Sequence, residues 1–134
     1  MRWYVWWYDI LPTPQPVYIS LIEWVPASPF GASENLVHIS TPSLTLQDVA
    51  IHDLNDTSVN NPIWLSTNTL VMESMQILNM VAGVQIMTIK PWNETQDSSL
   101  ALTDVYFSNN NDTGVTQGMF SIDFVQANVA ISGL

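Results

Sequence analysis

Apolar and polar residues alternate along much of this chain of 134 residues. Residues 17–25 alternate imperfectly and end at Pro26, and residues 119–131 alternate with a phase change at Phe124 and Val125. Alternation is the pattern of a strand with one buried face, and proline and Asx residues between such runs favour turns. The pattern predicts a mainly β protein.

The segment 43–57 returns without a gap as the segment 99–113, with eight identical positions. Identical pairs include Ser43 with Ser99, Leu44 with Leu100, Leu46 with Leu102, Asp48 with Asp104 and Val49 with Val105. The similarity continues more weakly to Ile63-Trp64 against Met119-Phe120. We predict that one β unit occurs twice, at about 43–65 and 99–121.

Within each unit the alternation changes phase near Asp48 or Asp104. An extra residue in one strand, a β-bulge, would produce such a change. The Asn-Asp-Thr triplets that follow are typical of turns, because Asx side chains bond their own backbone. Each unit is expected to be strand, bulge, strand, turn and strand.

The segment between the two units has two possible interpretations, a helix and a pair of strands. Val71, Met75, Leu78 and Ala82 fall at helical spacing, and Gly83 could cap a helix. The competing interpretation is a pair of strands leading into residues 84–89. We therefore expect at most one helix, in a β-sandwich or jelly-roll-like domain over residues 17–134.

The first sixteen residues are predicted to form an aromatic and proline-rich arm. Its aromatic residues are Trp3, Tyr4, Trp6, Trp7 and Tyr8. Prolines at 12, 14 and 16 cannot donate backbone hydrogen bonds and favour an extended connector. The arm either docks on a neighbouring subunit or folds back as an edge strand of its own domain.

Charge is scarce and strongly biased, which limits the classes of partner. Twelve carboxylates oppose two basic residues, Arg2 and Lys90, for a formal net charge of −10. Such a surface repels nucleic acid and anionic lipid, so membrane contact is expected only through the arm. There is no cysteine to form disulfides, and the aromatic opening lacks a signal-peptide pattern, so we expect Met1 to be the true start.

No catalytic or metal-binding motif is evident. His38 and His52 lack a partner at helical metal-ligand spacing, and there is no glycine-rich phosphate loop or nucleophile elbow. Acids such as Glu23, Glu34 and Glu73 could form an acid–base pair only if the fold brought two of them together. We expect neither enzymatic activity nor a cofactor.

Two functions follow from these patterns. The leading hypothesis is a structural assembly subunit of a virion or an extracellular filament, such as a capsid, decoration or spike-base protein, binding itself or other structural subunits. The alternative is a carbohydrate-binding module in which a tryptophan stacks on sugar rings. Trp92, in a predicted loop, is the better candidate for that contact, because Trp64 aligns with Phe120 and is expected in the core.

Overall fold

The computed structural model describes residues 3–5, 8–10, 13–24, 37–53, 61–82, 85–108, 110–112, 120–122 and 127–132. These residues form strands joined by turns, and no helix is present among them. In particular, none of the described segments is a helix long and apolar enough to cross a membrane.

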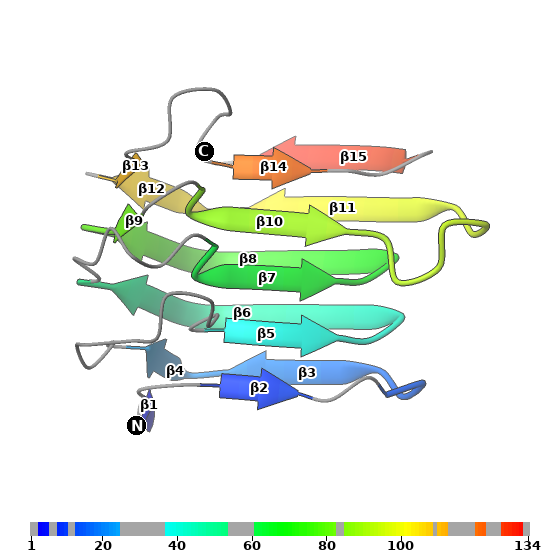
Figure 1. Ribbon diagram of the computed structural model, residues 1–134, viewed down its shortest axis with the longest axis horizontal. Coiled ribbons are helices and arrows are strands. Elements are labelled where there is room, and N and C mark those ends of the chain that lie inside the picture. Colours follow the sequence, from blue (N-terminus) through cyan, green and yellow to red (C-terminus); the bar gives the residue numbers. More distant parts are fainter. Residues whose placement is uncertain are drawn as a thin grey trace.

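The strands lie in two sheets, one behind the other (Figure 1). The front sheet contains, in order, β2 (Tyr8–Ile10), β5 (Val37–Ser40), β7 (Ile63–Ser66), β10 (Met87–Lys90) and β14 (Phe120–Ile122). The back sheet contains β1 (Trp3–Val5), β4 (Ile22–Trp24), β6 (Ser43–His52), β8 (Thr69–Leu78), β11 (Ser98–Thr103) and β15 (Ala127–Ser132), with β3 (Val17–Ser20) beside β6 and β12 (Tyr106–Ser108) beside β8. A short third pair joins β9 (Val81–Ala82) to β13 (Asn111–Asp112).

Every strand pair among the described residues is parallel. The chain runs along a front strand, turns a corner, returns along a back strand and then begins the next front strand one level higher (Figure 1). Successive strands of each sheet are therefore neighbours. This architecture is a parallel β-solenoid, in which each coil contacts the coils before and after it.

The prediction of a β-sandwich or jelly roll was wrong, because those folds pair antiparallel strands. Alternation shows which residues of a strand face the core, but it is the same for parallel and antiparallel neighbours. The Asn-Asp-Thr triplets were predicted to form turns. Residues 55–57 lie outside the described residues, and Asn111–Asp112 of the second triplet forms the short strand β13.

The structural repeat is shorter than the predicted duplication. Ser43 pairs with Thr69 of the next coil, and Thr69 pairs with Ser99 of the coil after that. The interval from Ser43 to Ser99 therefore spans two coils, and β8 lies between the two units as a third copy of the same strand. The helical interpretation of residues 71–82 was wrong, and the competing interpretation as a pair of strands was correct, since Thr69–Leu78 forms β8 and Val81–Ala82 forms β9.

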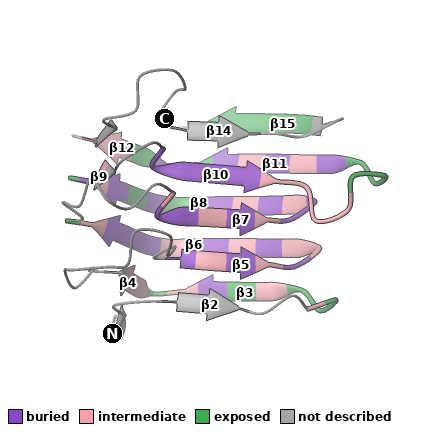
Figure 2. Cartoon of the chain, viewed as in Figure 1, coloured by how far each residue is buried: buried purple, intermediate pink, exposed green. Residues whose placement is uncertain are grey.

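Columns of apolar side chains fill the space between the sheets. Figure 2 colours the buried residues purple along the middle strands of both sheets. Leu44, Leu70 and Leu100 occupy the same register position in successive strands of the back sheet, and each is at most 2% exposed. The other buried columns are Leu46, Met72 and Leu102; Val49, Met75 and Val105; Val37, Ile63 and Met87; and Ile39, Leu65 and Ile89. Each coil thus buries its apolar face against its neighbours.

In each of four coils, one residue at the same register position of the back sheet has a left-handed backbone. These residues are Leu21 (φ 57°), Asp48 (φ 51°), Ser74 (φ 54°) and Asp104 (φ 51°). Residues on either side of this level stay paired, Gln47 with Glu73 and Val49 with Met75. The alternation therefore changes phase where the sequence predicts, but a bend common to all four coils causes it and no residue is left over as in a bulge.

The backbone of the predicted arm belongs to the two sheets. β1 pairs with β4, and β2 pairs with β5. This placement corresponds to the alternative in which the segment folds back on its own domain. Trp6 and Trp7 lie outside the described residues, as do the side chains of Trp3, Tyr4 and Tyr8, so a docking role for the arm stays a prediction.

Candidate functional site

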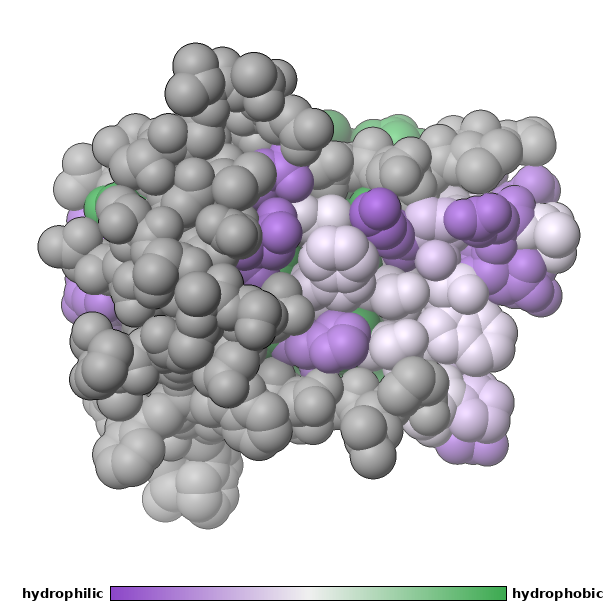
Figure 3. Space-filling view, in the orientation of Figure 1, coloured by the Kyte–Doolittle hydropathy of each residue, from purple (hydrophilic) through white to green (hydrophobic). Residues whose placement is uncertain are grey.

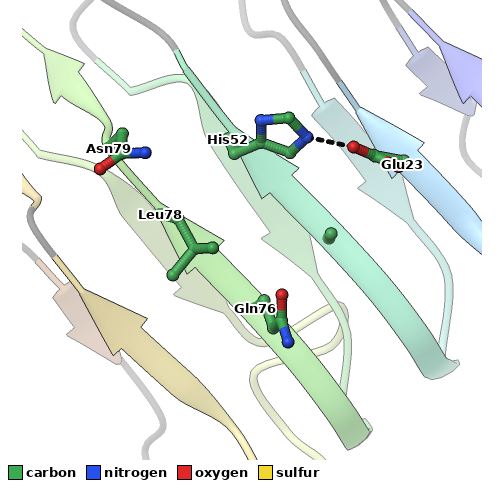
Figure 4. A pocket seen from close by; sticks show the side chains of 6 residues that line it. Glu23, His52, Gln76, Leu78 and Asn79 are labelled. Carbon is green, nitrogen blue, oxygen red and sulfur yellow. Dashed lines mark hydrogen bonds and ion pairs between the residues drawn. The ribbon is translucent and has the colours of Figure 1, made fainter.

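A chain of polar side chains crosses the carboxyl ends of three back-sheet strands, and Figure 4 shows the contact between His52 and Glu23. The His52 Nε2 atom lies 2.5 Å from Glu23 Oε1, and its Nδ1 atom lies 2.7 Å from Asp53 Oδ2. Asn79 then donates from Nδ2 to Asp53 Oδ1 at 3.1 Å. We call these four residues the polar bridge, because they connect β4, β6 and β8.

Strand ends position the members of the polar bridge. His52 is the last residue of β6, and Glu23 lies beside Ala50 in the neighbouring strand β4. Asp53 and Asn79 occupy equivalent places in successive coils, and both have left-handed backbones, with φ of 64° and 54°. Asp and Asn tolerate this conformation better than most residues, so they end the strands and also bring their side chains to one edge.

The two carboxylates change the titration of the bridge. Burial lowers the pKa of His52, but hydrogen bonds to Asp53 and Glu23 outweigh it and raise this pKa above 6.5. The hydrogen bond from His52, followed by that from Asn79, lowers the pKa of Asp53 below 3.8. Each charged form stabilises the other, so the imidazolium is the favoured state of His52 at mildly acidic pH.

The geometry of the bridge suits a structural contact better than catalysis. A shallow hollow of about 250 Å³ lies beside it, lined by Glu23, Ala50, His52, Gln76, Leu78 and Asn79. Both nitrogens of the imidazole already face carboxylates, so neither is available to accept a proton from a substrate. Among the described residues that line the hollow there is no Ser, Thr, Cys or Lys to act as a nucleophile. Nor does the described part of the chain contain three His, Cys, Asp or Glu residues grouped to hold a metal ion.

A second hollow, of about 620 Å³, lies over the row of left-handed residues. Its lining consists of Tyr18, Ser20, Leu21, Gln47, Asp48 and Ser74. Tyr18 is 61% exposed and donates its hydroxyl hydrogen to Gln47 Oε1. The hollow offers the aromatic face of Tyr18, but the Tyr18 hydroxyl already donates a hydrogen bond to Gln47 Oε1.

The predicted sugar contact, Trp92, lies in the loop between β10 and β11 and is half-buried. The amide of the next residue is already engaged, since Asn93 Oδ1 accepts hydrogen bonds from the backbone N–H and the hydroxyl of Thr95. Asn68 holds the loop by donating to Asn93 O and accepting from Asn93 N–H at 2.7 Å. The Asn93 Oδ1 atom and the Asn93 backbone next to Trp92 therefore hold the loop together.

Trp64 was expected in the core, and this expectation was wrong. It alternates with buried Ile63 and Leu65 in β7, so its half-buried ring lies on the outer face of the front sheet. Lys90 Nζ lies 5.4 Å from the centre of that ring, a cation–π contact. Figure 3, in the orientation of Figure 1, shows purple and pale atoms over the described part of the front face. Phe120 pairs with Met87, one position away from the predicted alignment.

One end of the solenoid leaves its core columns open. β15 is the last strand of the back sheet, and its Val129 and Ile131 pair with Leu100 and Leu102. These two side chains continue the buried leucine columns, yet they are 57% and 52% exposed. We call β15 with these side chains the open edge. Figure 3 shows apolar colour at the upper margin, where Figure 1 places β15.

The opposite end of the same columns is covered. Ile19 lies in the first coil, level with Leu46 through the pairing of β3 with β6, and is only 5% exposed. Val17 and Ile22 are partly buried and pack against the core. The two ends of the solenoid therefore differ, because the core columns are covered at the first coil and open at β15.

Sequence reasoning did not find the polar bridge or the open edge. A signal for the bridge exists in the coil repeat, because Asn79 follows Asp53 at the same interval at which Thr69 follows Ser43. A signal for the open edge lies in Ala127–Ser132, which alternates like the earlier strands and begins one coil after β11. Both signals become visible only when the period of one coil is known.

Searches of protein-family models, of curated proteins and of solved structures found no match to this chain.

Proposed function

We propose that the chain is a structural assembly subunit that acts through protein–protein contacts, in a virion or an extracellular filament. The open edge is the observation that carries this proposal. Val129 and Ile131 are more than half exposed although their equivalents Leu100 and Leu102 are buried. Two further features support it: a chain with few charges, and a sequence with no recognisable catalytic motif.

A strand such as β15, with one edge that no described strand pairs with, favours association with another strand. Proteins usually protect an edge strand with charged residues, proline or a covering segment. The sequence of β15, Ala-Asn-Val-Ala-Ile-Ser, contains no charge and no proline. An edge with backbone groups to pair and apolar side chains to bury can bind another strand without any active site.

The alternative, carbohydrate binding at Trp92, has less support. Stacking on a sugar needs an accessible ring together with polar groups that are free to bond hydroxyls. The Oδ1 atom of Asn93 is engaged within the loop and Trp92 is half-buried. The open edge is the stronger observation, and we place assembly first.

The proposal is tested by the absolute mass of the full chain in solution, measured by light scattering over a range of concentrations. We expect a mass above the 15.0 kDa of a single chain. The variant Ile131→Lys should return the protein to monomers, because it places a charge in the apolar edge. A monomer at every concentration of the unmodified chain would refute self-assembly.

Tyr18→Lys is the matched control. Tyr18 is an exposed apolar side chain like Ile131, at 61% against 52%, but it lies in the first coil. It gains the same charge as the test variant. Its mass should stay that of the unmodified chain, and loss of assembly in this variant would show that the contact lies elsewhere.

A further inference from the structure

We infer that the partner of the open edge is the same edge of a second copy, joined antiparallel about a two-fold axis at Ala130. This inference rests on the proposed assembly function and specifies its geometry. It predicts a closed dimer in which the back sheets of two solenoids become continuous. The orientation of β15 and the difference between the two ends of the solenoid support it.

In β15, the backbone N–H and C=O groups of alternate residues point away from the neighbouring strand β11. Asp104 donates its N–H to Ser132 O, so the carbonyl of Ser132 points toward the neighbouring coil. Backbone polar groups alternate in direction along a strand. Those of Asn128 and Ala130 therefore point toward β11, and those of Val129 and Ile131 point outward, where no described strand pairs with them.

An antiparallel second copy satisfies these groups in one register. With Ala130 facing its own equivalent, Val129 of each copy lies opposite Ile131 of the other. Those two residues form hydrogen-bonded pairs, which gives roughly four hydrogen bonds across the edge. The same register places apolar side chains against each other on the core face and keeps Asn128 and Ser132 together on the outer face.

Moving the register by one residue removes this match. The side chain of Val129, which lies on the core face of the sheet, would then lie opposite a residue whose side chain is on the outer face, since side chains alternate with a period of two. The strand is thus complementary to itself in the register centred on Ala130. No charged residue lies within β15 to oppose that pairing, although each chain carries a net charge of −10.

The unequal ends favour a two-fold contact at this edge over head-to-tail stacking. Head-to-tail stacking would pack the open edge of one copy on the first coil of the next. That coil already has its core column covered, since Ile19 is 5% exposed. The described residues show this open apolar edge at β15 alone, and such an edge is buried most completely by an isologous contact, in which both copies use the same patch.

Cysteine cross-linking tests the register, and the absence of native cysteine makes it unambiguous. In the variant Ala130→Cys, the two thiols face each other across the axis as a non-hydrogen-bonded pair, with Cβ atoms about 4.5–5.5 Å apart. Mild oxidation by oxidised glutathione should convert most of the full-length variant to a disulfide-linked dimer. Reduction should reverse the cross-link.

Asn128→Cys is the matched control at an exposed position of the same strand. Its two thiols lie about 13 Å apart in this register, from a rise of about 3.3 Å per residue, and cannot be bridged. A mixture of Asn128→Cys with Ser132→Cys should instead give the mixed dimer. This pattern identifies the antiparallel register centred on Ala130.

The outcomes separate this inference from the proposed function. An assembly that Ile131→Lys disrupts, but in which Ala130→Cys does not cross-link or the mass exceeds that of a dimer, would overturn the two-fold contact and leave the assembly function standing. A chain that is monomeric throughout would overturn both. Cross-linking of Asn128→Cys to itself at a comparable yield would also contradict the inferred register.

Discussion

Residues with a left-handed backbone recur at the same register position in successive strands of the back sheet, and they show how single positions shape each coil. The left-handed conformation costs a non-glycine residue roughly 1 to 2 kcal/mol. Asp48 and Asp104 are well suited to it, whereas Leu21, with φ of 57°, is not. The bend turns the strand so that residues on both sides of it still face the core.

The cost of the bend can be measured at Ser74, which is exposed and has φ of 54°. We expect Ser74→Gly to raise the free energy of unfolding by about 0.5 to 1 kcal/mol, because glycine adopts this backbone without strain. Chemical denaturation followed by circular dichroism measures the change. Asp48→Ala should lower the stability, since alanine lacks the polar side chain that favours this conformation.

Glu73→Gly provides the control, one residue away in the same strand and also exposed. Its position does not have a positive φ, so glycine there only adds conformational freedom to the unfolded chain and should lower the stability. If both glycine variants changed the stability in the same direction, the bend at Ser74 would not carry the expected strain.

At the scale of elements, the polar bridge joins the ends of β4, β6 and β8 and makes their association depend on pH. The raised pKa of His52 means that its contribution is complete below the unfolded value of 6.5 and is lost as pH rises through the folded pKa. The lowered pKa of Asp53 means that its contribution is present above 3.8 and is lost as pH falls through the folded pKa. The bridge is therefore most stabilising between these two values.

We expect His52→Gln to lower the free energy of unfolding by about 1 kcal/mol near pH 5 and by less near pH 9, in line with partly exposed ion pairs. Urea denaturation at both pH values measures the difference. His38→Gln, on the front sheet, removes the other histidine and serves as control. An effect of His52→Gln that is equal at the two pH values would show that the charge of the bridge does not contribute.

Buried polar corners support the same coils. Thr41 and Thr67 are fully buried at equivalent corners, where their N–H groups bond Ser66 O and Lys90 O of the next coil. The Thr67 hydroxyl donates to Thr69 O, two residues ahead, and the Thr41 hydroxyl donates to Gln15 O at 2.6 Å, with Ser43 O farther away at 3.2 Å. Because these buried polar atoms have partners, the corners can cross between sheets without leaving them unsatisfied.

At the scale of the whole molecule, net charge opposes the inferred dimer while the open edge favours it. Two chains of charge −10 repel each other, and this repulsion is screened over about 30 Å at 0.01 M salt but about 3 Å at 1 M. We expect the dissociation constant of the dimer to fall about tenfold across that range. Analytical ultracentrifugation measures it, with Ile131→Lys remaining monomeric in both salts.

Weaker association at high salt would point to a different interface. That result would mean that opposite charges hold the copies together, which the uncharged sequence of β15 cannot provide. Stronger association at high salt agrees with burial of apolar side chains and pairing of backbone groups.

The sequence by itself determined that the chain is mainly β and which residues of 44–51 and 100–105 face the core. It also located the change of phase at Asp48 and Asp104 and showed that one unit recurs. These properties are local, because alternation and backbone preference depend on neighbours in the chain. The same sequence predicts from its charge that nucleic acid is not a partner, and that stays a prediction.

Only the tertiary structure decided that the strands pair in parallel, that one coil leads from Ser43 to Thr69, and that β8 is a strand. It also decided that Glu23 meets His52 from a distant part of the chain and that Val129 and Ile131 remain uncovered. The physical reason is that pairing and burial depend on which distant segments become neighbours. Leu100 and Val129 have the same pattern in sequence, and only their places in the stack of coils make one buried and the other exposed.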